Sequence, residues 1–196
     1  GIVIGGALAL YAWRAPGLDS EAGFHATSRE TFLLLNNVLL IIATALILGG
    51  TLAPLLVELF TGAKISVGPP YFEIAFAIPM LPLVLLMGVG MHSAWRSQDM
   101  GPLMRLLKVP AIIALALGIA IPVAIYGSGS VLLVIGVIAA IWIMAVSMIQ
   151  PVRSWRRAPG TPPITRSVLG MSIAHFGVGM FVLGVAIVSA FSVEAD

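Results

Sequence analysis

Long apolar runs separated by short polar connections dominate the chain. The runs are continuous and lack the two-residue alternation of membrane barrel strands. A helix of about 22 residues reaches about 33 Å, which is enough to cross the hydrocarbon core of a bilayer. The pattern therefore predicts an all-α polytopic membrane protein with about six transmembrane helices, at residues 1–13, 32–57, 71–95, 106–126, 131–150 and 167–191.

The first run is shorter than the others. Residues 1–13 cannot span a bilayer alone, because a spanning helix needs about 20 residues. We therefore expect residues 1–196 to form a single membrane domain that is part of a longer chain.

The composition also indicates that most of the chain is surrounded by lipid rather than by water. The sequence of 196 residues is 60% hydrophobic and 9% charged, whereas about a quarter of the residues in a soluble domain are charged. The net charge is only +2, so membrane lipid is an expected partner and nucleic acid is not. The sequence has no cysteine, which excludes disulfides and thiolate metal sites.

Basic residues are concentrated in alternate connections. Nine of the ten lie in residues 14–31, in residues 96–105 with Lys108 just beyond, and in residues 151–166, whereas the other side of the membrane has only Lys64. Basic connections stay on the cytoplasmic side. This distribution predicts that the three basic connections are cytoplasmic and that both ends of the segment face outside, for example into a periplasm.

His175 is the candidate with the clearest chemistry. It lies well inside the last apolar run, where an ionisable residue marks a functional site by default. Neutral imidazole is a standard axial ligand of haem iron, so His175 is our candidate metal ligand. The alternative is an interhelical hydrogen bond through the imidazole. We interpret His25 as a solvated loop residue and His92 as an interfacial anchor beside Trp95 and Arg96.

Three further residues could line a cofactor site. Gly179 is four residues after His175 on the same helical face, where a small residue lets a flat macrocycle or another helix approach closely. Asn36 and Asn37 are polar positions about two turns into the second apolar run. They could line a cofactor cavity, or they could form hydrogen bonds between helices.

Other functional classes find less support. No carboxylate lies near the middle of an apolar run, although ion pumps and proton-coupled carriers usually keep one there. The sequence has no nucleotide-binding loop and no Ser-His-Asp arrangement. A secondary transporter or permease subunit remains the alternative.

Four strings carry a resemblance to a known family. The strings are Ser28-Arg-Glu followed by Asn36-Asn37, Gly50-Thr-Leu-Ala-Pro54, Ile65-Ser-Val-Gly-Pro-Pro-Tyr-Phe72, and Gly170-Met-Ser-Ile-Ala-His-Phe-Gly177. In this order and spacing they resemble CcmF, the large membrane subunit of the cytochrome c haem lyase of system I cytochrome c maturation.

The resemblance implies a specific role. CcmF-type proteins receive haem from the haem chaperone CcmE and act with CcmH-type and CcmI-type subunits, which present apocytochrome c. They also hold a b-type haem between two transmembrane histidines. The string around His175 matches the second of these, so the resemblance implies that His175 is an axial ligand of haem b.

The sequence also departs from the family pattern. The tryptophan-rich external motif, its flanking histidines and the first transmembrane histidine have no counterpart here. We therefore expect this segment alone not to catalyse thioether formation between haem and apocytochrome c.

Overall fold

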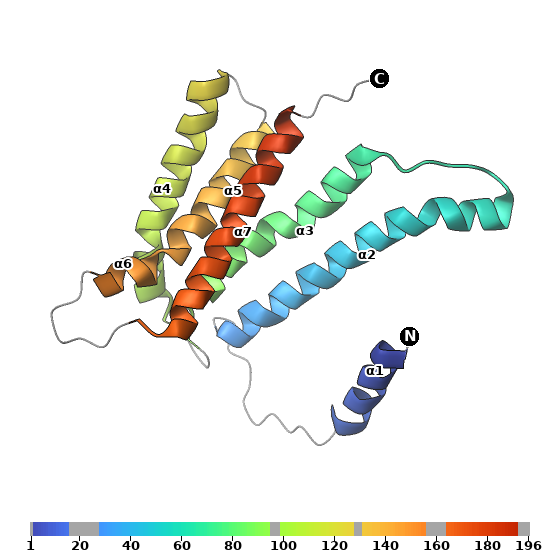
Figure 1. The fold of residues 1–196 in the computed structure, drawn as a ribbon, viewed down its shortest axis with the longest axis horizontal. Coiled ribbons are helices and arrows are strands. Elements are labelled where there is room, and N and C mark those ends of the chain that lie inside the picture. Colours follow the sequence, from blue (N-terminus) through green and yellow to red (C-terminus); the bar gives the residue numbers. More distant parts are fainter. Residues whose placement is uncertain (1, 16–27, 95–98, 128–130, 156–163, 192–196) are drawn as a thin grey trace.

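The computed structural model describes residues 2–15, 28–94, 99–127, 131–155 and 164–191. All regular elements in these ranges are helices, which confirms the predicted all-α class (Figure 1). They are α1 (Ile2–Arg14), α2 (Arg29–Thr61), α3 (Pro69–Gly90), α4 (Met100–Tyr126), α5 (Val131–Ser147), α6 (Ile149–Trp155) and α7 (Arg166–Phe191).

Five helical segments are long and apolar enough to cross a membrane, with α5 and α6 together forming one of them. Helix α1 is apolar but shorter, as expected of residues 1–13. Many large apolar side chains on the helices are exposed, and Leu59, Ile78 and Phe181 are examples. Such extensive apolar surface is stable in lipid and not in water.

Two helices extend beyond their predicted bounds. Helix α2 begins at Arg29, because the Ser28 side chain accepts a hydrogen bond from the backbone N–H of Thr31 at 3.2 Å. It ends at Thr61, because the following Gly62 has a φ of 72°, a left-handed conformation that favours glycine. Helix α4 begins at Met100, so Arg105 lies on this helix rather than in the preceding connection.

The fifth and third runs end differently from the prediction. Pro151 cannot donate a backbone hydrogen bond to the carbonyl of Ser147, and its ring would clash with that carbonyl. The continuous helix predicted for 131–150 is therefore divided into α5 and α6. Helix α3 ends at Gly90, before the predicted end at residue 95.

Helix α5 is the centre of the packing. It lies against α4, α7 and α3, while α2 packs against α3 (Figure 1). The buried core combines Val84 of α3, Leu103 and Leu107 of α4, and Trp142 and Ile143 of α5.

Close approach between α3 and α5 depends on Gly88. The indole of Trp142 packs against this glycine, and a Cβ there would come within 2.9 Å of the indole Cε2. The indole Nε1–H donates a hydrogen bond to the Leu85 carbonyl at 3.2 Å.

The helices begin and end at two faces of the bundle. α2, α4 and α7 begin at one end, where α3 and α6 finish (Figure 1). We call this the basic end, defined by Arg29, Arg105, Arg153 and Arg166. Lys64 lies at the opposite end, between α2 and α3. This arrangement agrees with the predicted partition of charge, and the cytoplasmic location of the basic end stays a prediction.

Candidate functional site

His175 lies on α7 and is half-buried. Its Nδ1 is 2.8 Å from the carbonyl oxygen of Met171, one turn back along the helix. Helical side chains tilt toward the N-terminus, and this tilt brings the ring to that carbonyl. A carbonyl oxygen only accepts hydrogen bonds, so Nδ1 carries the proton and donates it. The lone pair of Nε2 is therefore available to a metal ion.

This geometry fits the axial position of a haem. The backbone hydrogen bond fixes the tautomer and the ring orientation, as an outer partner does for most metal-bound histidines. The porphyrin supplies the equatorial ligands of its iron, so a single protein histidine is sufficient on one face. Within the described residues, no group of three or more histidines, cysteines or carboxylates could hold a bare metal ion.

Gly179 lies one turn beyond His175 and packs against α5. A Cβ at this position would overlap Met144 Cγ and would come within 2.9 Å of Ile143 Cγ2 and 3.0 Å of the Ala140 carbonyl oxygen. Of the two predicted uses of a small residue here, the structure shows the close approach of another helix. A role of Gly179 in cofactor binding stays a prediction.

The structure does not bring the two predicted asparagines to His175. Asn36 is half-buried and Asn37 is exposed, and both lie on α2. In the extensive helix contacts of the described residues, α2 pairs with α3, while α7 pairs with α5 and α6. Cofactor contact by Asn36 or Asn37 stays a prediction. His25 lies outside the described residues.

The structure adds His92 to the surroundings of His175. His92 follows the last turn of α3, and both of its ring nitrogens are buried. Burial lowers the pKa of His92, a hydrogen bond to the backbone of Gly88 partly opposes this change, and the positive charge of Arg153 lowers the pKa further. His92 thus lies within electrostatic range of Arg153 on α6 and of His175 on α7.

Sequence reasoning missed this grouping. The polar neighbours Trp95 and Arg96 made interfacial anchoring a sufficient explanation of His92. The signal that identifies the grouping is spatial, because α3, α6 and α7 are distant in sequence and meet only in the folded bundle.

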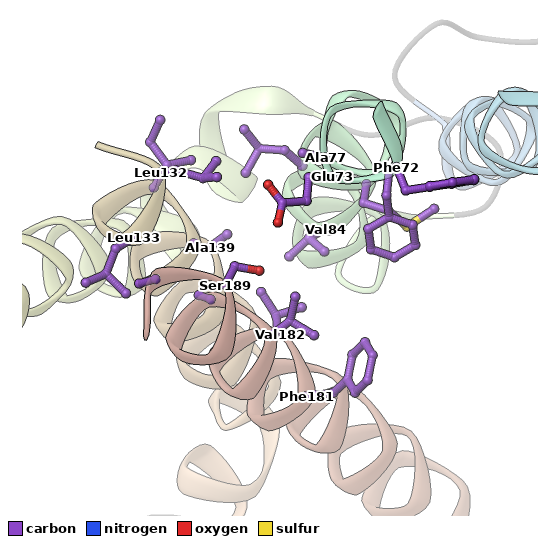
Figure 2. A pocket seen from close by; sticks show the side chains of 18 of the residues that line it. Phe72, Glu73, Ala77, Val84, Leu132, Leu133, Ala139, Phe181, Val182 and Ser189 are labelled. Atoms are coloured by element: carbon purple, nitrogen blue, oxygen red, sulfur yellow. The ribbon is translucent and has the colours of Figure 1, made fainter. Parts of the chain in front are cut away.

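An apolar cavity of about 460 Å³ lies further from the basic end, lined by residues of α2, α3, α5 and α7. Figure 2 shows the Glu73 carboxylate and the Ser189 hydroxyl directed into it among aliphatic and aromatic side chains. Val182 and Ser189 line the cavity at a spacing of seven residues, and His175 precedes Val182 by seven. His175 therefore continues, toward the basic end, the face of α7 that borders the cavity.

These features define a polytopic α-helical membrane protein with a histidine in one span, whose Nδ1 is hydrogen-bonded to the helix backbone. The chain is 37% identical over 99% of its length to the cytochrome c-type biogenesis protein CcmF of Pseudomonas fluorescens. It is 38% identical over 98% of its length to CycK of Rhizobium meliloti and 34% identical over its full length to CcmF of Escherichia coli. The chain belongs to the CcmF family of cytochrome c-type biogenesis proteins, as its four strings predicted.

The match covers only part of these relatives. The chain spans about 30% of the length of each of the three. No protein-family model matches the chain, and no solved structure matches it.

Proposed function

We propose that this chain is a haem-binding part of the cytochrome c haem lyase, in which His175 is an axial ligand of haem b. Two findings support the proposal. The relatives are named as cytochrome c-type biogenesis proteins, and the string around His175 matches the ligand helix of the family. The observation that carries it is the 2.8 Å hydrogen bond from Nδ1 to the Met171 carbonyl, which leaves Nε2 free for iron.

The residues around His175 position this ligand. Gly179 contacts α5 one turn from His175, and this contact sets the distance between α5 and α7. That distance determines how far the His175 imidazole lies from α5. Bound haem would supply a one-electron redox centre in the membrane, with a potential that depends on its axial ligands.

The wider assembly is part of the same proposal. The protein would act in the bacterial inner membrane with the haem chaperone CcmE and with CcmH-type and CcmI-type subunits. Its purpose would be to assist the covalent attachment of haem to apocytochrome c.

Substitution of His175 in the complete protein tests the proposal. We expect His175→Ala to lose most of the bound haem, and His175→Met to retain haem with an altered potential, because axial ligand identity sets the potential. His25→Ala is the matched control and should leave the haem content unchanged. The measurements are haem content per protein and the position of the Soret band.

A normal haem content and an unshifted Soret band in His175→Ala would refute the ligand assignment. A haem-free wild-type protein that catalyses solute flux would instead support the transporter alternative.

A further inference from the structure

We propose that the apolar cavity between α3, α5 and α7 binds phosphatidylethanolamine, a phospholipid with a primary ammonium headgroup, and that Glu73 binds this ammonium. The inference goes beyond the proposed function, because it involves neither haem nor His175. It starts from the depth of the cavity and from the acidic side chain in its wall.

The cavity is confined to the half of the bundle away from the basic end. Its lining residues lie between residues 72 and 84 of α3, 132 and 139 of α5, and 181 and 190 of α7. The distance from Phe72 to Val84 is about 18 Å along the helix axis. One leaflet of the hydrocarbon core is about 15 Å thick, so the depth of the cavity matches the acyl chains of one leaflet.

Packed side chains close the inner limit of the cavity. Val84 belongs to the buried core, and Val182 packs against that core. Nearer the basic end, the indole of Trp142 fills the space beside Gly88 between α3 and α5. A spanning helix of about 30 Å would extend past this limit, whereas a lipid chain ends within its own leaflet. The shape of the cavity therefore favours a lipid over another helix.

Glu73 supplies the charge that selects the headgroup. It lies four residues after Pro69, the first residue of α3, which is about 6 Å along the helix. This position is at the level where headgroups meet hydrocarbon, because α3 is about as long as the hydrocarbon core is thick. Figure 2 shows the Glu73 carboxylate directed into the cavity.

The described residues provide no cation for this carboxylate. None of them forms an ion pair with Glu73, and Lys64, the basic residue at this end, pairs with Glu58 at 4.0 Å. A carboxylate beside apolar side chains is stabilised by a charged hydrogen-bond donor. A cationic group on the ligand is therefore the partner that Glu73 lacks.

The chemistry of the headgroup separates the common phospholipids. A primary ammonium has three N–H donors, as in lysine, whereas the choline headgroup has methyl groups in their place. Phosphatidylglycerol has no cation, and its negative charge would repel Glu73. On the opposite wall, the Ser189 hydroxyl can donate a hydrogen bond to a phosphate or ester oxygen of the same lipid (Figure 2).

Native mass spectrometry of the complete protein tests the inference. The protein is purified in detergent, depleted of lipid, and titrated with phosphatidylethanolamine, phosphatidylcholine and phosphatidylglycerol of identical acyl chains. We expect the first phosphatidylethanolamine to bind the wild type about fivefold or more tightly than either of the others. Glu73→Gln should remove this preference. Glu58→Gln, at an acidic side chain of the same end that already has a partner, is the matched control and should keep it.

A second pair of variants tests the cavity itself. Ala77 lines the cavity, so Ala77→Phe should fill part of it and weaken the binding of all three lipids. Ile78→Phe is the matched control, because Ile78 is 64% exposed and does not line the cavity. It should leave the affinities unchanged.

Several results would overturn the inference. Equal affinities of the three lipids for the wild type would do so, as would an undiminished preference for phosphatidylethanolamine in Glu73→Gln. If the complete protein binds none of these lipids, another part of it occupies the cavity, and the inference is wrong. None of these outcomes affects the assignment of His175, which is tested separately by haem content.

Discussion

The contact between Gly179 and α5 should make this glycine far less tolerant of a methyl group than another glycine of the same helix. In Gly179→Ala the new Cβ would overlap Met144 Cγ and press on Ile143 and on the backbone of Ala140. The backbone oxygen cannot rotate away, so α5 and α7 must separate. Overpacking of this kind costs about 1–3 kcal/mol.

Gly184→Ala is the matched control. Gly184 lies on the same helix, and a Cβ there would have no neighbour within 4 Å. Both substitutions gain the same helix propensity, up to about 1 kcal/mol, which cancels in the difference between the two variants. We therefore expect Gly179→Ala to be less stable than Gly184→Ala by about 1–3 kcal/mol. The assay is unfolding by sodium dodecyl sulfate in mixed micelles, followed by circular dichroism.

The Gly179→Ala substitution should also affect haem binding, because His175, the proposed haem ligand, is only one turn from Gly179. A separation of α5 and α7 should lower the haem content of Gly179→Ala and leave that of Gly184→Ala unchanged. Equal unfolding midpoints for the two variants would show that α7 does not approach α5 as closely as the structure has it.

Two further predictions concern packing and topology. Trp142→Phe should lower the free energy of unfolding by about 1 kcal/mol, because it removes the hydrogen bond from Nε1 to the Leu85 carbonyl; Trp155→Phe, at a side chain that is 90% exposed, should not. A similar loss in both variants would contradict this account. In this cysteine-free chain, Ser154→Cys should resist a membrane-impermeant thiol reagent applied to intact cells, whereas Lys64→Cys should react. Reaction of Ser154→Cys from outside would reverse the topology.

The class of fold was predictable because one constraint dominates it. Backbone groups in lipid must be paired within the chain, so continuous apolar runs of spanning length become helices. Helix ends were less predictable, since they depend on single residues rather than on periodicity. The Ser28 cap, the left-handed Gly62 and the effect of Pro151 on the Ser147 carbonyl each moved a boundary. All three signals are present in the sequence, but hydropathy alone does not contain them.

The candidate site was likewise predictable from the sequence only in part. His175 could be singled out because it is the only histidine well inside an apolar run. The proximity of His92 to His175 could not be predicted, because its interaction with Arg153 and His175 exists only after α3, α6 and α7 have packed. The position of Asn36 and Asn37 away from His175 could not be predicted either, because the polarity of a residue within a span does not reveal which helix it will face.

The His175 ring is hydrogen-bonded to a backbone oxygen, and this determines how the orientation of the ring is maintained. The Met171 carbonyl remains in place whatever side chain occupies position 171, provided that α7 stays helical. The tautomer of His175 is therefore set by the helix itself, and not by a second side chain that one mutation could remove. Helix α7 has no internal proline, so this turn keeps its regular geometry. If Nε2 binds iron as proposed, the ring is already oriented before the iron arrives, and binding loses no free energy in ordering it.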